Sequence, residues 1–144
     1  MQMPYNLAIL IDDDSIFNYI SATYIRKMVQ PNQVEIVIFS QPKEALEYLA
    51  GQEPGSLKNA IIFLDINMPV MSGWELLDAL AETPVGIEKL FGLYVLSSSI
   101  DLEDKKKAQA NVLVDGFLSK PLTKQLDQIF AKSSIHTTVV RQVI

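Results

Sequence analysis

The chain has 144 residues, of which 49% are hydrophobic and none is cysteine, and its formal net charge is −5 at pH 7. This length suits a single domain with its own hydrophobic core, and the absence of cysteine excludes disulfides and thiolate chemistry. The acidic balance argues against direct binding of nucleic acid, because phosphates repel such a surface.

The N-terminal sequence MQMPYNLAILIDDD lacks the basic segment of a signal peptide. No apolar run approaches the roughly 20 residues that a membrane helix needs. We therefore expect a cytoplasmic protein with no membrane contact.

Short apolar runs rich in β-branched residues recur along the chain, with segments of helical period between them. The expected strands are residues 6–11, 34–39, 60–64, 90–96 and 115–119. The expected helices are residues 15–29, 41–50, the segment that begins at the Ser72/Glu75 capping box, 102–111 and 123–132. The middle three strands are continuously apolar, which is typical of strands covered on both faces of a parallel sheet. The alternation predicts an α/β fold, a doubly wound parallel sheet of five strands with five helices.

Two of the expected helices should pack differently. The helix over 15–29 has an apolar stripe expected to face the core, formed by Ile16, Ile20, Tyr24 and Met28. The helix over 102–111 is the weakest packer, and its inward candidates are Leu102, Ala108 and Ala110. Such a helix is a candidate mobile element, although its DKKK face suits an ordinary charged surface equally well. Residues 51–56, GQEPGS, are expected to form a surface loop.

Polar side chains stand where four of these strands end. They are Asp12, Asp13 and Asp14 after the first strand, Asp65 after the third, Ser97, Ser98 and Ser99 after the fourth, and Lys120 with Pro121 after the fifth. Alone, each has an ordinary explanation as a helix cap, a polar loop or a surface lysine, and at least one of the three aspartates is expected to be a cap. Together, at the edge where open α/β sheets bind ligands, they are expected to converge on one pocket.

The chemistry of these groups is coherent. Carboxylates with no cysteine or histidine nearby form a hard-oxygen site that suits Mg²⁺, and without a cation their repulsion would raise at least one pKa. An aspartate can accept a phosphoryl group covalently, while a hydroxyl and an ammonium can bind its oxygens. The pattern predicts phosphoryl transfer onto an aspartate.

Four segments, ILIDDDS, FLDINMPVMSG, VLSSS and FLSKPL, resemble the motifs of a response-regulator receiver domain, the phospho-acceptor half of bacterial two-component signalling. The resemblance covers roughly residues 5–132. It implies a chemotaxis-type, stand-alone receiver of flavodoxin-like fold, with strand order 2-1-3-4-5, over residues 1–132. Residues 133–144 are left as a C-terminal tail of uncertain structure.

The resemblance also implies roles for individual residues. Asp65 matches the phosphoacceptor, Asp13 matches the direct acidic ligand of Mg²⁺, which Mn²⁺ can replace, and Asp12 acts beside it through water. Asn67 would give its backbone carbonyl to the metal.

Further residues match the family's switch. Ser97 takes the place of a hydroxyl, usually threonine, that turns towards the phosphoryl group, and Phe117 takes the place of the switch aromatic. Lys120 matches the lysine that pairs with the acceptor and then with the phosphoryl group, and the Lys120–Pro121 bond would be cis.

The implied function is a signalling switch, not an enzyme beyond its own phosphorylation and dephosphorylation. Its partners would be a sensor histidine kinase or a histidine phosphotransfer protein and a downstream protein target, and the chain would be a monomer or weak dimer. The same residues fit a phosphorelay intermediate that passes the group to a histidine phosphotransfer protein, and only the partners distinguish the two. A Mg²⁺-dependent phosphohydrolase with an Asp nucleophile is disfavoured, because its second carboxylate would stand at Asn67.

Overall fold

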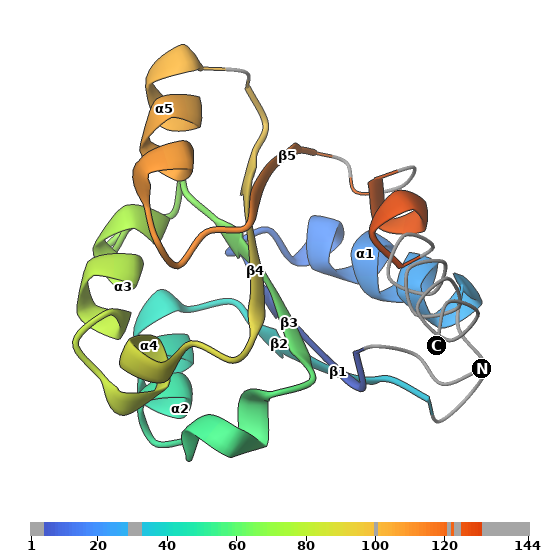
Figure 1. The fold of residues 1–144 in the computed structure, drawn as a ribbon. Coiled ribbons are helices and arrows are strands. Elements are labelled where there is room, and N and C mark those ends of the chain that lie inside the picture. The colour runs from blue at the N-terminus through green and yellow to red at the C-terminus, as the bar shows by residue number, and fades with distance from the viewer. Residues whose placement is uncertain (1–4, 29–32, 100, 121, 123–124, 131–144) are drawn as a thin grey trace, which may run out of the picture.

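The computed structural model describes residues 5–28, 33–99, 101–120, 122 and 125–130, and these contain one five-stranded sheet (Figure 1). The strands are β1 Leu7–Ile11, β2 Glu35–Phe39, β3 Ala60–Asp65, β4 Gly92–Ser97 and β5 Gly116–Ser119. They pair in parallel in the order β2-β1-β3-β4-β5. The predicted fold and strand order are confirmed.

The helices are α1 Ser15–Met28, α2 Pro42–Ala50, α3 Gly73–Leu80, α4 Pro84–Glu88, α5 Leu102–Ala110 and a last helix over 125–130. The described residues thus hold six α-helices where five were expected, and α4 is the extra one. Its signals are a proline in the first turn and Thr83, whose hydroxyl oxygen accepts the Gly86 N–H at 3.2 Å. The GQEPGS loop also differs from expectation, because a 3₁₀ helix, η1 Pro54–Leu57, begins inside it and buries Leu57. No helix in the described residues is long and apolar enough to span a bilayer.

The sheet is covered on both faces (Figure 1): α2 to α5 lie on one side, and α1 with helix 125–130 on the other. All six residues of β3 are buried, because side chains of successive residues point into opposite apolar layers. Ile62 and Leu64 belong to the first layer, and Ile61 and Phe63 to the second. Packing from both sides therefore fixes where β3 ends, and it ends at Asp65.

The stripe expected to bury α1 is correct only in its second half, because Tyr24 and Met28 are partly buried against the second apolar layer, whereas its first two residues are not. Ile16 is 71% exposed and Ile20 is 43% exposed. The buried residues of α1 are Phe17, Asn18, Ser21, Ala22 and Ile25. Both stripes have helical spacing, and the buried stripe lies next to the predicted one on the helix surface. The buried stripe contains small residues where α1 approaches its neighbours.

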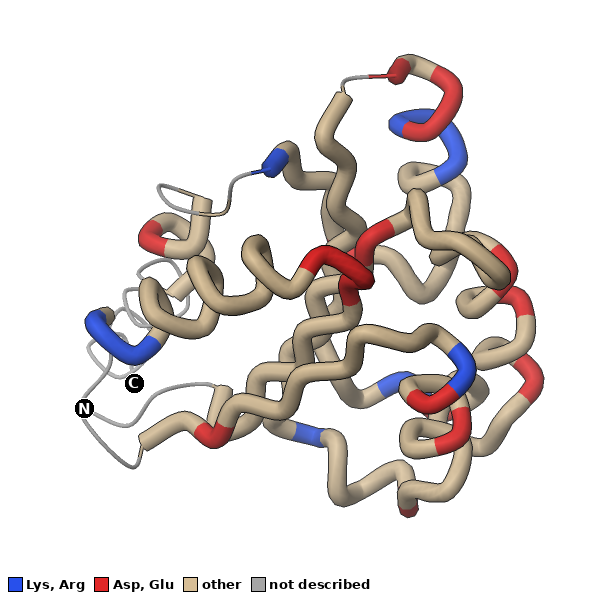
Figure 2. The backbone as a smooth tube through the Cα atoms, turned by 180° about the vertical axis from the view of Figure 1, so that it is seen from behind, with Lys and Arg blue, Asp and Glu red and all other residues tan. Residues whose placement is uncertain are grey.

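Only one residue of α5, Ala108, is buried, so the helix packs weakly, as expected. Of its other inward candidates, Leu102 and Ala110 are exposed, contrary to expectation. Acidic residues stand in its first turn and Lys107 in its last (Figure 2), an order that complements the helix dipole. α5 therefore contacts the rest of the protein through Ala108 and through surface contacts such as the hydrogen bond between Trp74 and Asp104.

Candidate functional site

The three aspartates after β1 have three different environments. Asp12 is 1% exposed, and its Oδ1 accepts the N–H of Asp14 at 2.9 Å. Asp13 is exposed. Asp14 caps α1, because its Oδ1 accepts the N–H groups of Ile16 at 3.0 Å and Phe17 at 3.1 Å. The expected cap is confirmed, and it leaves Asp12 and Asp13 for another purpose.

The loop after β3 fixes the position of the Asp65 carboxylate. Asp65 is 3% exposed, and its Oδ1 accepts the backbone N–H of Asn67 at 3.1 Å. The chain returns so closely that a Cβ atom on Gly73 would lie 2.6 Å from the carbonyl oxygen of Asp65, so only glycine fits there. Ser72 and Glu75 then form the predicted capping box that starts α3. The second carboxylate oxygen of Asp65, Oδ2, faces the Lys120 ammonium.

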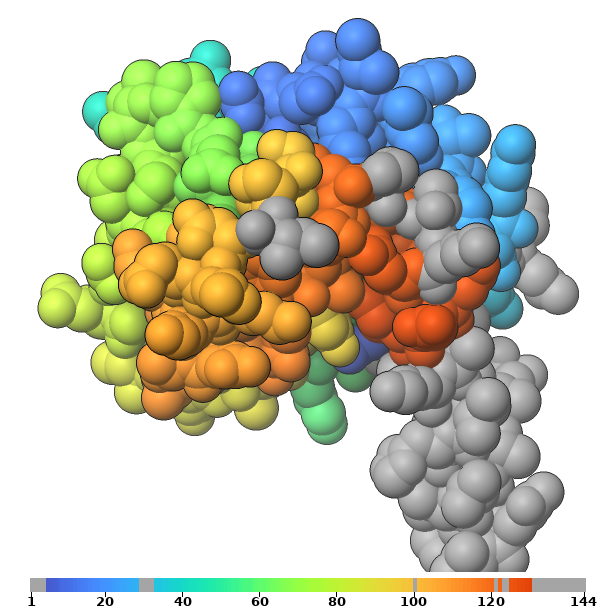
Figure 3. Space-filling view, turned by 90° about the horizontal axis from the view of Figure 1, so that it is seen from above, coloured from blue at the N-terminus to red at the C-terminus, as the bar shows by residue number. Residues whose placement is uncertain are grey.

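The strand ends bring the predicted acidic groups and the lysine together. One carboxylate oxygen from each of Asp12, Asp13 and Asp65 lies within 4.8 Å of the others. The Nζ atom of Lys120 is 2.6 Å from Asp12 Oδ2 and 3.4 Å from Asp65 Oδ2. Figure 2 shows the acidic residues that follow β1 beside the end of β3, and Figure 3 views the same edge from above, where the segments after β1 and β3 flank the segment after β4.

Ser97 ends β4 fully buried. Its Oγ accepts the N–H of Ser99 at 3.2 Å and lies 3.5 Å from Nδ2 of Asn67, which donates to it. We expected only the backbone carbonyl of Asn67 to act, so its side-chain contact with Ser97 was missed. No sequence signal reports it, because it depends on how closely the ends of β3 and β4 lie.

Phe117 lies on β5, half-buried, and packs against the same apolar layer as Val95. Pairing of Val95 with Phe117 and of Ser97 with Ser119 puts Phe117 on the sheet face of Ser97. Pro121 and the tail 133–144 lie outside the described residues, so the cis bond and the fate of the tail stay predictions.

The electrostatics of the site follow from burying like charges together. Burial raises the pKa of Asp65 to about 6; Asp12 adds to this rise, and the Asn67 N–H and Lys120 oppose it without cancelling it. Burial alone would lower the pKa of the Lys120 ammonium, but Asp12 and Asp65 outweigh it and raise that pKa above its ordinary value. The site therefore favours one retained proton or an added cation near Asp65.

The donor set fits a hard divalent cation. Within the part of the chain that the structure describes, the buried Oδ2 of Asp12 accepts no hydrogen bond, and Lys120 is its ion-pair partner. Three converging carboxylates without histidine or sulfur prefer Mg²⁺ to softer metals.

The raised pKa predicts that Asp65→Asn stabilises the metal-free protein above pH 6. Between the ordinary value of 3.8 and about 6, the folded protein binds more protons at Asp65 than the unfolded chain. Stability therefore falls as the pH rises through this window. Removing the charge should raise the free energy of unfolding by about 1 to 2 kcal/mol at pH ~8 and by little at pH ~4.

Urea denaturation in EDTA at the two pH values measures this difference. Asp78→Asn, which removes an exposed carboxylate on α3, is the matched control and should show no pH-dependent gain. An equal gain from Asp65→Asn at both pH values would contradict the assignment.

Comparison with known proteins supplies an independent finding. Residues 8–132 match the model of the response regulator receiver domain family. No curated protein sequence matches the chain. Among solved structures, a two-component response regulator from Cytophaga hutchinsonii is 34% identical, with a TM-score of 0.74, 92% of this chain covered and 98% of that one.

Two further structures are similar in fold. A response regulator receiver protein from Dyadobacter fermentans is 23% identical, with a TM-score of 0.74 and coverage of 88% of this chain and 94% of that one. The chemotaxis protein CheY4 of Vibrio cholerae is 20% identical, with a TM-score of 0.69 and coverage of 90% and 98%.

Proposed function

Because the chain belongs to the response regulator receiver domain family, we propose that it is a phosphorylation-controlled signalling switch. Asp65 accepts a phosphoryl group from a sensor histidine kinase or a histidine phosphotransfer protein, and the phosphorylated form binds a downstream protein. The observation that carries this proposal is the meeting of Asp65 with Asp12, Asp13 and Lys120 at one edge of the sheet.

In the proposed reaction a carboxylate oxygen of Asp65 attacks the phosphorus of a phosphohistidine. The O–P bond forms as the N–P bond breaks, and the electron pair of that bond returns to the imidazole nitrogen. With a pKa of about 6, Asp65 is mostly ionised at neutral pH and can act as the nucleophile. The chain catalyses only its own phosphorylation and dephosphorylation, and it turns over no other substrate.

Asp12, Asp13, Asp65 and the carbonyl of Asn67 would hold a Mg²⁺ ion. When bound, that ion supplies positive charge that neutralises both the carboxylates and the incoming phosphoryl oxygens. Lys120 can pair with the phosphoryl group after it is transferred, because its ammonium already lies between Asp12 and Asp65.

Ser97 carries the signal away from Asp65. Its hydroxyl oxygen accepts hydrogen bonds from the Ser99 N–H and from the Asn67 side chain. These two bonds do not use the hydroxyl hydrogen, so Ser97 can donate it to a phosphoryl oxygen. The added charge of nearly −2 favours this charge-assisted bond. Turning Ser97 inward would free space on the sheet face of Phe117 and pull on the segment that leads to α5.

The exposed apolar side chains of α1 support a protein donor as the partner. Ile16, Tyr19 and Ile20 are exposed on the helix that starts beside the acidic cluster. A donor that brings a phosphohistidine to Asp65 must contact the rim of this site, so these apolar side chains are available for it.

The function is tested by phosphotransfer from a panel of autophosphorylated sensor kinases and phosphorylated histidine phosphotransfer proteins. Radiolabel should reach the wild-type chain from at least one donor in Mg²⁺, and EDTA or Asp13→Asn should greatly reduce it, because the cation site loses its metal or a ligand. Label that reaches Asp65→Asn as readily as the wild type would overturn the proposal.

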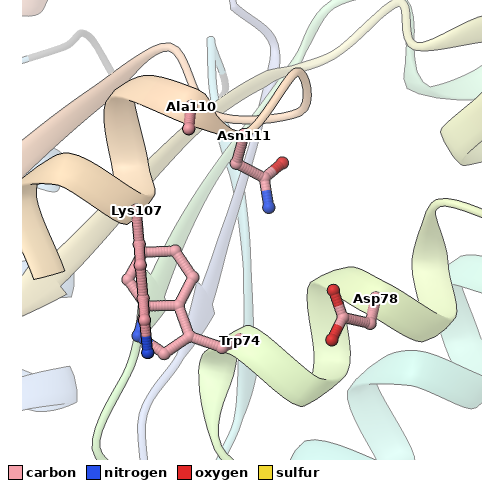
Figure 4. A pocket seen from close by; sticks show the side chains of 5 residues that line it. All are labelled: Trp74, Asp78, Lys107, Ala110 and Asn111. Atoms are coloured by element: carbon pink, nitrogen blue, oxygen red, sulfur yellow. The ribbon is translucent and has the colours of Figure 1, made fainter.

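The single tryptophan of the chain should report the switch. Trp74 of α3 donates from Nε1 to Asp104 Oδ1 of α5 at 3.2 Å, and Lys107 Nζ lies 5.9 Å from its ring centroid. Figure 4 shows Lys107 lying along the ring, beside a hollow of about 360 Å³ between α3 and α5. A shift of α5 would change these contacts.

We therefore expect phosphorylation by acetyl phosphate to move Trp74 emission to longer wavelength, because the ring gains contact with water. Steady-state fluorescence after Mg²⁺ addition, and again after acetyl phosphate, separates metal binding from the switch. Asp65→Asn should show no change when acetyl phosphate is added. An emission spectrum unaltered by full phosphorylation would show that α5 stays in place.

A further inference from the structure

The third partner of Lys120 is an aromatic ring. Its Nζ atom lies 4.5 Å from the ring centroid of Phe17, a distance typical of a cation–π contact. The ring is 7% exposed and the Lys120 side chain 15% exposed, so little water competes with the contact. The ammonium is thus enclosed by two carboxylates and a π face.

The sequence DDDSIF places this ring. Asp14 caps α1 by accepting the N–H of Phe17 itself, at 3.1 Å. Asn18, the next residue, donates from Nδ2 to the carbonyl oxygen of Asp12 at 2.8 Å. These two bonds tie the first turn of α1 to the end of β1, so the position of the ring is linked to that of the acidic cluster.

A π face differs from a carboxylate in how it holds an ammonium group. The contacts of the ammonium with Asp12 Oδ2 at 2.6 Å and Asp65 Oδ2 at 3.4 Å are ion pairs, and each weakens as the ammonium moves away from that oxygen. The ring attracts an ammonium group that lies over its face, within about 6 Å of the centroid. The ammonium could therefore move from Asp12 towards Asp65 without leaving the ring.

We propose that Phe17 is a positioning residue, whose ring keeps the Lys120 ammonium over the acidic cluster while it exchanges a carboxylate for a phosphoryl oxygen. The consequence for phosphorylation rests on the proposed function of Asp65, but the contact itself does not. The ordinary alternative is that Phe17 only fills the apolar layer between α1 and helix 125–130, where it is also packed.

The contact is tested first without any phosphorylation. In NMR spectra of the metal-free protein, the ε-methylene protons of Lys120 should be shifted upfield by the ring current. The shift should persist in Phe17→Tyr, which keeps a π face, and vanish in Phe17→Leu, which keeps apolar bulk. Unshifted protons in the wild type would overturn the proposal whether or not Asp65 is a phosphoacceptor.

The consequence is tested by replacing Phe17 with mono-, di- and trifluorinated phenylalanine, which weakens the quadrupole with little change of shape. The initial rate of phosphorylation by acetyl phosphate at saturating Mg²⁺ should fall stepwise, by roughly threefold to tenfold over the series. In a Lys120→Met background the same series should have no effect. If fluorination does not change the rate in the wild-type background, Phe17 is only a packing residue. The same conclusion follows if the rate falls equally in the Lys120→Met background.

Discussion

Lys120→Met is expected to lower the free energy of unfolding of the metal-free protein by about 3 kcal/mol, because it leaves a buried carboxylate without its countercharge. Asp12 is almost fully buried, and its Oδ2 is paired with Lys120 at 2.6 Å. Methionine keeps most of the side-chain length and removes the charge. Protonation of Asp65 offsets part of the loss, since its pKa is already raised to about 6.

The same substitution should slow phosphorylation of Asp65 by on the order of 100-fold, the usual cost of removing one donor aimed at developing negative charge. Added Mg²⁺ should restore much of the stability, because a cation replaces the lost countercharge, but it should not restore the rate. Urea denaturation with and without Mg²⁺, together with phosphorylation rates, separates the two effects.

Lys105→Met is the matched control. Lys105 is exposed on α5, and its replacement should change stability by no more than about 0.5 kcal/mol. If Lys120→Met were as stable as this control and were phosphorylated at the wild-type rate, Lys120 would have no part in the site.

Much of the site could be predicted because parallel strands end together. The apolar run before Asp65 identifies a strand buried on both faces, and such a strand leaves little freedom for the residue that follows it. The topology then brings the aspartates after β1 and Lys120 after β5 to Asp65, and it brings Ser97, the last residue of β4, to Asn67.

The buried face of α1 could be predicted only in part, because it depends on a partner far away in the chain. The stripe of Ile16 and Ile20 and the stripe of Phe17 and Ser21 have the same period, so periodicity cannot choose between them. The choice follows from helix 125–130, which packs over α1 and receives the hydroxyl of Tyr24 at Asp127, 103 positions away.

The helix α4 and the contact between Phe17 and Lys120 were not predicted for two other reasons. α4 spans only five residues, too short for a periodic pattern, although Thr83 and Pro84 are a recognisable helix start. The ring of Phe17 beside Lys120 joins the first turn of α1 to the end of β5, and a single sequence holds no pattern for such a contact.

Asp65 is the proposed phosphoacceptor. Its carboxylate is the buried group on which the other side chains converge, and asparagine in its place keeps the shape and the bond from Asn67 but loses the nucleophile. Phosphorylation should therefore be abolished in Asp65→Asn, the largest effect expected of any single change in the chain.

Intact-mass spectrometry after incubation with Mg²⁺ and acetyl phosphate measures this directly. The wild type should gain the mass of one phosphoryl group, EDTA should prevent the gain, and Asp65→Asn should remain unmodified while it stays folded by circular dichroism. A wild type that binds Mg²⁺ yet gains no mass, or an Asp65→Asn variant that gains the same mass, would contradict the account.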